Sequence, residues 1–271
     1  MIKNILWLGL ALLFCAFLIK GLDNRLVKTS YVIKSPKLKG KIKIAFLSDL
    51  HYCPYGPGQV KLLQMVREIN PDLVLLGGDI VDDKARPLPA KESLEQLQQI
   101  APCFYVSGNH ENYTGQLDLI KEMIKSYGVE VLAGERVEVR VGSNRINILG
   151  IDDPLVGTAY QEQLDYLAGL HNPEFTLFLA HHPERIHDYE KVEADLVLSG
   201  HAHGGLWRIP HILPGIVATG QGLFPKYTAG IYFLANKKLL VNRGLSLWSP
   251  KLPRFYNPPE VVELVLEGVD H

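Results

Sequence analysis

The sequence predicts an α/β fold, with one large domain behind an apolar N-terminal stretch. Short apolar runs alternate along the chain with segments of helical periodicity, the order expected when strands and helices pack in layers. The runs are almost continuously apolar, as in parallel strands that are buried on both faces. With 271 residues, of which 47% are hydrophobic, the chain is long enough to form a substantial core.

The overall charge and the cysteines exclude several classes of protein. A net charge of −1 argues against a nucleic-acid-binding protein, which would show a strong basic excess. The three cysteines (Cys15, Cys53 and Cys103) are scattered and lack CxxC spacing. We therefore expect neither a disulfide framework nor a zinc–thiolate site. The oligomeric state is left open.

The first element is an uncharged apolar stretch, residues 4–19, between Lys3 and Lys20. It is slightly shorter than the ~20 residues of a spanning helix, but lysines at both ends can reach the membrane interface. A secretory signal peptide is one alternative, although no small-x-small cleavage site follows; a core helix is another, although the stretch lacks a polar face. We expect residues 1–22 to form an uncleaved, single-pass membrane anchor or a signal-like helix.

The next segment, residues 23–40, is basic and polar. We expect it to be a linker beside the membrane, with one strand at Tyr31–Ile33. More lysines and arginines follow the apolar stretch than precede it, and such residues favour the cytoplasmic side of a span. We therefore expect the remaining chain, residues 41–271, to be a cytoplasmic domain at the cell membrane.

Five apolar runs in this domain are each followed by the same kinds of polar residue. The runs in IKIAFLSDLH, DLVLLGGD, CFYVSGNH, FTLFLAHH and ADLVLSGHAH all terminate in Asp, Asn or His. Helical periodicity fills the intervals at Gln59–Ile69, Ala90–Gln99 and Leu117–Tyr127. Because functional side chains of layered α/β folds gather beyond the carboxyl ends of the strands, we expect a single site at that edge.

The polar residues at these strand ends are a set of candidate metal ligands and their neighbours. They are Asp49, His51, Asp79, Asp82, Asn109, His110, His181, His201 and His203, and they include five of the ten histidines. Each residue alone could be a helix cap, a turn residue or a core histidine, but those roles do not explain why five strand ends behave alike. Carboxylate, imidazole and amide ligands without thiolate suit Mn, Fe or Zn.

This set is larger than one ion requires. A carboxylate can bridge two cations, and two metals about 3.5–4 Å apart form the arrangement that hydrolyses phosphate esters with an activated water. The sequence contains neither a G-x-S-x-G serine elbow nor a phosphate-binding P-loop. It therefore predicts hydrolysis with two divalent metal ions and without a protein nucleophile.

The ordered blocks DLH, GDIVD, GNHE, HH and GHAHGG resemble the calcineurin-like metallophosphoesterase superfamily from about Lys41 to the C-terminus. The resemblance implies a four-layer αββα sandwich with a two-metal site at the strand ends. By position, it implies one metal on Asp49, His51 and His203, a second on Asn109, His181 and His201, and a bridge by Asp79. It also implies that His110 stabilises the phosphoryl group or protonates the leaving oxygen, and that Asp82 orients His110.

The blocks GNHENYTG, AHHPE, VNRGL and PRFYNPPEVVELVL resemble a bacterial, often membrane-associated branch of that superfamily. Some members of the branch are UDP-diacylglucosamine pyrophosphohydrolases. This chain departs from the branch at Ala202, where threonine is usual, and at Leu206, where glutamine is usual. Neither residue is a predicted ligand, so the departures bear on specificity. Weaker substrate-binding candidates are Arg243 and Arg254, which could clamp a phosphate, and Tyr113, which could stack on a base or sugar.

The sequence therefore predicts a phosphoester or pyrophosphate hydrolase that acts on a small-molecule or lipid substrate at or near a membrane. One alternative is a secreted phosphomonoesterase with a cleaved signal. Another is an inactive relative that serves as a metal-binding scaffold. Inactive relatives commonly lose ligands, whereas every ligand position is filled here, and this favours the enzyme.

Overall fold

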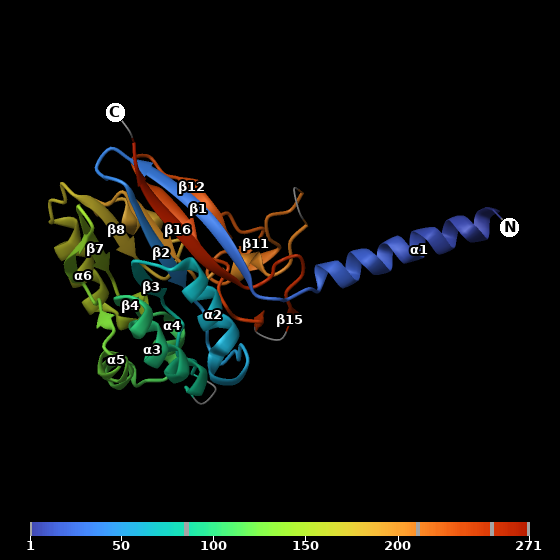
Figure 1. The fold of residues 1–271 in the computed structure, drawn as a ribbon, viewed down its shortest axis with the longest axis horizontal. Helices are drawn as coiled ribbons and strands as arrows, with labels where there is room; N and C mark the ends of the chain where they lie inside the picture. The colour runs from blue at the N-terminus through green and yellow to red at the C-terminus, as the bar shows by residue number, and fades with distance from the viewer. Residues whose placement is uncertain (1, 84–86, 210–211, 250–251, 270–271) are drawn as a thin grey trace.

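The computed structural model describes residues 2–83, 87–209, 212–249 and 252–269. Helix α1 (Ile2–Gly21) projects away from the rest of the molecule, in which two large sheets are packed together and covered by helices (Figure 1). The N-terminal helix and the α/β class expected from the sequence are both present.

The first sheet has six strands in the order β1-β16-β2-β3-β4-β5. Their bounds are β1 Val27–Ser35, β16 Glu260–Gly268, β2 Lys41–Leu47, β3 Leu73–Gly77, β4 Cys103–Val106 and β5 Glu130–Val131. Strands β2 to β5 are parallel, and β16 runs antiparallel to β2. The helices that connect them are α2 (Val60–Ile69), α3 (Leu88–Ile100), α4 (Asn109–Tyr113) and α5 (Leu117–Ser126), with the 3₁₀ turn η1 at Pro57–Gln59.

The second sheet also has six strands, in the order β12-β13-β9-β8-β7-β6. Their bounds are β12 Gly230–Phe233, β13 Lys238–Val241, β9 Leu196–Ser199, β8 Phe175–Leu179, β7 Asn144–Gly150 and β6 Arg136–Val141. The remaining elements are η2 (Pro154–Val156), α6 (Thr158–Ala168), α7 (Ile186–Tyr189), η3 (His203–Gly205) and the short pairs β10 (Val217–Ala218) with β11 (Gly222–Leu223) and β14 (Trp248–Ser249) with β15 (Leu252–Pro253).

Three hydrophobic clusters lie between four stacked layers of secondary structure. The central cluster joins the facing sides of the sheets, for example Phe46 and Leu75 with Leu177 and Leu198. A second cluster packs α2, α3 and α5 on the outer face of the first sheet, and a third packs α6 and α7 on the outer face of the second. This is the αββα sandwich that the resemblance implied. Strands β3, β8 and β9 are buried throughout because a layer covers each of their faces.

Strand β1 differs in length from the sequence-based expectation. Only Tyr31–Ile33 was expected as a strand, whereas Val27–Ser35 pairs in parallel with the whole of β16. Much of the segment expected as a linker is therefore an edge strand of the first sheet. The pairing could not be predicted locally, because its partner β16 lies more than 200 residues further along the chain. The domain boundaries themselves stay a prediction.

Helix α1 is nearly all exposed except at its C-terminal end. The ring of Phe17 lies 5.5 Å from that of Phe255 and 5.0 Å from that of Tyr256, and the Tyr256 hydroxyl donates to the Phe17 carbonyl (3.0 Å). Residues Lys3–Gly21 are long and apolar enough to cross a bilayer, a property that signal sequences share.

Candidate metal centre

The predicted site residues meet at one edge of the two sheets. Asp49 and His51 follow β2, Asp79 follows β3, and Asn109 and His110 begin α4 after β4. From the second sheet, His181 follows β8, and His201 and His203 follow β9. All of them are buried except His110, which is partly exposed. The strands place these side chains together because their carboxyl ends lie at a common edge.

Three groups of potential metal ligands lie within this set of residues: Asp49, His51 and His203; Asp79, His181 and His201; and His51, Asp79 and His110. In each group, the ligand atoms lie within 4.8 Å of one another. The resemblance implied Asn109, His181 and His201 for the second metal, with Asp79 as the bridge, and this assignment of ligands stays a prediction.

Asp79 belongs to the group with His181 and His201 and also faces His51 of the first group. Its Oδ2 atom is 3.1 Å from His181 Nε2 in one group and 3.9 Å from His51 Nε2 in the other. Its Oδ1 atom accepts a hydrogen bond from the His110 backbone N–H (2.8 Å). One oxygen is therefore fixed by the backbone, while the other is directed at imidazoles of both groups.

Several buried atoms of the cluster have no hydrogen-bond partner among the described residues. They are Asp49 Oδ2, Asp79 Oδ2, Asn109 Oδ1, His201 Nε2 and His203 Nδ1. A buried polar atom left without a partner costs about 1–3 kcal/mol, so this many in one place would strongly destabilise a fold that held nothing there. Oxygen and imidazole nitrogen atoms are the donors that divalent metals bind, and the cluster fits such ions.

The backbone of the cluster is strained. Asp49, His51, Asp79, His201 and His203 all have positive φ, between 46° and 64°. They make up half of the ten non-glycine residues with positive φ in the described part of the chain. This conformation costs about 1–3 kcal/mol per residue and is concentrated at functional sites.

Two glycines allow the strained segments to approach the ligands. Gly78 has φ +87°, and a Cβ atom there would lie 2.6 Å from His181 Nδ1. Gly244 has φ +75°, and a Cβ atom there would lie 2.6 Å from Asp49 Oδ2. A side chain at either position would displace a predicted ligand.

Hydrogen bonds from neighbouring groups orient two of the imidazoles. His181 Nδ1 lies 2.7 Å from the Gly77 carbonyl oxygen, so Nδ1 carries the proton and Nε2 is directed at Asp79. His51 Nδ1 lies 3.0 Å from Asp82 Oδ2. Such contacts fix the tautomer and ring orientation of metal-binding histidines.

Burial and neighbouring carboxylates together set the charge of the histidines. Burial lowers the pKa of His203 to about 3 and the pKa of His201 well below its usual value. Both rings are therefore neutral at pH 7, the form that binds metals. Burial also opposes the charged form of His181, but the Asp79 carboxylate outweighs burial and raises the pKa of His181 well above its usual value.

Two acidic side chains lie near His110 Nδ1, and Asp83 is closer to it than Asp82. Asp83 Oδ1 lies 2.6 Å from His110 Nδ1, whereas Asp82 Oδ2 lies 3.5 Å away and is closer to His51. Sequence reasoning singled out Asp82 because it matches the position in the family and missed Asp83, whose only signal was being an adjacent acid in GDIVDD. The role of Asp82 as the orienting group of His110 stays a prediction.

The weaker substrate-binding candidates have different surroundings. Tyr113 is exposed, and its ring lies 5.7 Å from that of His110. Arg243 pairs with Glu260 (2.6 Å), and Arg254 is fully buried and donates to the Arg243 carbonyl (2.8 Å). Tyr113 thus borders the cluster, whereas both arginines have partners inside the protein. Their contact with substrate stays a prediction.

Sequence reasoning missed the role of Glu111. This buried carboxylate accepts hydrogen bonds of 2.7–3.0 Å from the backbone N–H groups of Asp79, Ile80, Val81 and Gly108. It therefore ties the loop after β3 to the loop after β4. Burial and the neighbouring Asp79 raise the pKa of Glu111 to about 7, although its N–H donors favour the ionised form.

His182, which directly follows the predicted ligand His181, packs against His201. Its ring lies 3.8 Å from the His201 ring, centroid to centroid. His182 Nε2 is held by Asp153 (2.6 Å) and His182 Nδ1 by Glu184 (2.8 Å). Its ring therefore lies beside the ligand cluster, and with Glu184 and His201 it forms a further group of potential metal ligands.

A four-layer α/β sandwich with clustered carboxylate, amide and imidazole side chains at its strand ends is typical of a metal-dependent hydrolase. The chain belongs to the calcineurin-like phosphoesterase family, whose model matches residues 42–205. Enzymes of this family use divalent metals, and the oxygen and nitrogen ligands described above are suited to them. The protein is therefore a metallophosphoesterase.

Relatives support this assignment. An uncharacterized metallophosphoesterase of Campylobacter jejuni is 31% identical over 93% of this chain and 67% of its own length. The phosphodiesterase YaeI of Escherichia coli is 30% identical over 78% of this chain and 77% of its own length. A transmembrane protein with a metallophosphoesterase domain from Bos taurus is 30% identical over 88% of this chain and 55% of its own length.

Among solved structures, the NAD nucleotidase of Haemophilus influenzae matches with a TM-score of 0.48 and 14% identity. The match covers 76% of this chain and 46% of that one.

Proposed function

We propose that this protein hydrolyses a phosphoester or pyrophosphate bond at a membrane surface, with two divalent metal ions and a water as the nucleophile. The observation that carries the proposal is Asp79, which directs one oxygen at histidines of two ligand groups. Asp49, His51 and His203 would hold one ion, and Asn109, His181 and His201 the other. The ions are Mn, Fe or Zn, since the ligand types accept each of them.

Two ions held in this way would lower the pKa of a shared water and neutralise phosphoryl oxygens. The protein supplies positioning and proton transfer. The strained turns and the bonds to Gly77 and Asp82 fix the imidazoles before substrate arrives, which avoids reorganisation during the reaction. His110 is the most exposed member of the cluster, and Asp83 holds its Nδ1 atom. It is therefore placed to donate a proton to the leaving oxygen.

The proposed substrate is lipid-linked or a nucleotide, because α1 would hold the site close to a bilayer. The basic residues after α1 favour a cytoplasmic domain. The name of the Bos taurus relative, a transmembrane protein with this kind of domain, agrees with an anchored enzyme.

The test uses the full chain in detergent, stripped of metal and reloaded with Mn, Fe or Zn. We expect faster hydrolysis of bis-p-nitrophenyl phosphate than of p-nitrophenyl phosphate, and no hydrolysis without metal. Faster hydrolysis of the monoester would favour the secreted phosphomonoesterase. Metal binding without turnover of either compound would favour the inactive scaffold.

A further inference from the structure

Large apolar side chains are exposed in the loops beside the C-terminal end of α1. Trp207 is 41% exposed, Ile212 79%, Leu223 70%, Phe224 71% and Leu252 50%. We call these five residues the apolar loop surface. Scattered exposed apolar residues are normal, but several large ones carried by neighbouring loops are typical of a binding surface.

Backbone hydrogen bonds hold these loops together. The Ile216 N–H donates to the carbonyls of Gly205 and Trp207 (3.0 Å each), and the Phe224 N–H donates to the Ile216 carbonyl (2.8 Å). The Trp207 indole donates to the Pro253 carbonyl (2.9 Å), next to Leu252. Strands β11 and β15, which carry Leu223 and Leu252, lie at the end of the molecule from which α1 emerges (Figure 1).

The surface is continuous with α1. The ring of Trp207 lies 5.8 Å from that of Phe255, which in turn lies 5.5 Å from that of Phe17 in α1. The Tyr256 N–H donates to the Gly21 carbonyl (2.6 Å), and a Cβ atom on Gly21 would overlap the Phe255 ring. Aromatic side chains therefore join the end of the apolar helix directly to the loops.

The surface also borders the metal centre. The side-chain amide of Asn257 donates to the carbonyls of His203 (2.7 Å) and Leu206 (3.1 Å). Leu206 directly precedes Trp207, so the turn that carries His203 leads into the apolar loop surface.

We propose that the apolar loop surface inserts into the bilayer that α1 crosses, and that the site therefore acts on a phosphoester of a membrane lipid. This rests on the proposed function, in which α1 is an anchor. A bilayer is the occupant because a spanning α1 brings the loops at its end to the lipid interface. Trp207 is of a type enriched there, and the exposed Lys20 in the last turn of α1 suits anionic headgroups.

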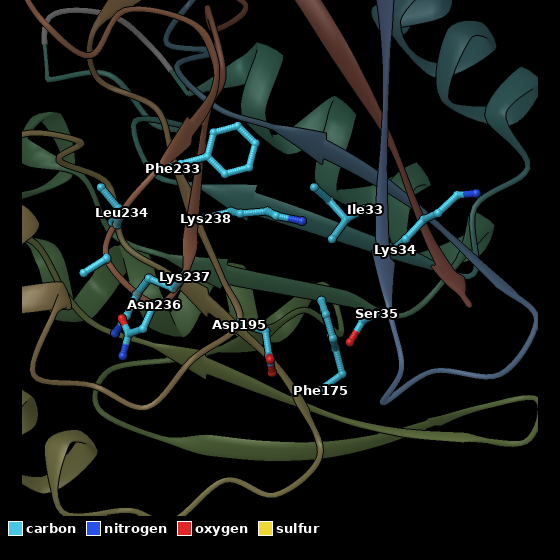
Figure 2. A pocket seen from close by; sticks show the side chains of 11 residues that line it. Ile33, Lys34, Ser35, Phe175, Asp195, Phe233, Leu234, Asn236, Lys237 and Lys238 are labelled. Atoms are coloured by element: carbon cyan, nitrogen blue, oxygen red, sulfur yellow. The ribbon is translucent and has the colours of Figure 1, made fainter. Parts of the chain in front are cut away.

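Phe233 provides a matched control. It is 80% exposed, similar to Phe224, but lies beside a separate pocket of about 380 Å³ with Ile33 and Lys238 (Figure 2). That pocket is also lined by Phe175, the first residue of β8, whereas His181 lies beyond the other end of the same strand. Phe233 is therefore at the opposite end of the strands from the metal centre.

The experiment measures the depth of single tryptophans in the full chain. The chain has three tryptophans, and each reporter variant retains or gains one in a background where the others are phenylalanine. The reporters are the natural Trp7 in α1, Phe224→Trp in the loop surface and Phe233→Trp as control. Each is reconstituted in nanodiscs of phosphatidylcholine and phosphatidylglycerol whose acyl chains are brominated near the headgroup, and circular dichroism verifies folding.

We expect the Phe224→Trp reporter to lose most of its emission to the brominated lipid, and the Phe233→Trp reporter to lose little. Equal, weak quenching of these two reporters would overturn the docking surface. Strong quenching of both would overturn it also, because it would show no preferred face. Quenching at Trp7 reports separately on the anchor of the proposed function.

A second measurement addresses the substrate class. The double variant Leu223→Ser with Phe224→Ser should hydrolyse soluble bis-p-nitrophenyl phosphate as fast as the unaltered protein. Its turnover of phosphatidyl-p-nitrophenol in the same nanodiscs should fall by about tenfold. Phe233→Ser should lower the turnover of neither compound. Equal turnover of the lipid by both variants would overturn the lipid assignment. Absence of any turnover by the unaltered protein would count against the proposed function, and the quenching result would still decide the docking surface.

Discussion

At the scale of single residues, the two oxygens of Asp79 have different surroundings. One accepts a backbone N–H, and the other faces histidines of two ligand groups. We expect Asp79→Ala to lower metal content and to abolish hydrolysis, because the shared ligand is lost while the strands remain. Elemental analysis, turnover and circular dichroism measure these three properties. Asp118→Ala, which removes an exposed acid on α5, is the control; unchanged activity of Asp79→Ala would contradict the bridging role.

His110 should behave differently from a ligand. We expect His110→Ala to lower kcat about 10²–10⁴-fold, the usual scale for an acid–base group, with metal content retained. Since Asp83 is closer to His110 than Asp82 is, Asp83→Asn should reproduce more of the kcat loss. Asp82→Asn should instead weaken metal binding through His51. Loss of metal from His110→Ala, equal to that of Asp79→Ala, would make His110 a ligand.

Residue types and spacing could predict the members of the cluster, but not their partners. Asp49, His201 and similar residues can be predicted from the sequence because each one follows an apolar run. Glu111 and Asp153 carry no such signal, because their roles depend on which loops meet after folding. The same applies to Arg254: a guanidinium in a loop suggests a phosphate clamp, and only the packed chain shows that it is fully buried.

At the scale of elements, buried strands and amphipathic helices are the predictable parts. Helices α2, α3 and α5 lie within a few residues of the expected segments because their apolar faces repeat with helical period. Strand β1 was expected to be three residues long, whereas it is nine residues long. It alternates between partly buried and exposed positions over most of its length, and its pairing with β16 depends on a contact that no local pattern contains.

Glu111 determines how two elements meet. In Glu111→Gln, an amide group would replace one oxygen and face two backbone N–H donors, of Asp79 and Gly108 or of Ile80 and Val81. Since an unsatisfied buried donor costs about 1–3 kcal/mol, we expect a loss of about 2 kcal/mol or more in stability. The measurement is the thermal unfolding midpoint of the metal-free protein. Glu162→Gln, the same substitution at an exposed position of α6, is a control that should not shift the midpoint.

At the scale of the whole molecule, metal ions should stabilise the fold. A ligand that binds only the native state stabilises it by about 2.7 kcal/mol at a concentration of 100 times Kd. We expect chelation to lower the Tm of the unaltered protein and Mn to restore it. Asp79→Ala should respond much less to either treatment. If neither chelation nor added Mn changes the Tm of the unaltered protein, that result would contradict a metal centre.

The side of the membrane is a separate property of the whole chain. If the domain is cytoplasmic, a C-terminal green fluorescent protein fusion should be bright, and a C-terminal alkaline phosphatase fusion should be inactive. An active phosphatase with a dark fluorescent fusion would place the domain outside. That result would not contradict metal-dependent hydrolysis. A cytoplasmic lipid precursor, however, would no longer be accessible as substrate.

The position of β16 has a consequence for biosynthesis. This last strand lies between β1 and β2, so the first sheet closes only after residue 268 has been made. Until then β1 has no partner strand over its full length, because β16 is its only neighbour in the sheet that the structure describes. If α1 is the proposed anchor, it can therefore enter the bilayer while the domain is still open, and the first sheet is completed last. A premature stop codon before Glu260 would leave a tethered chain with an unpaired sheet edge, which is a substrate for quality-control proteases.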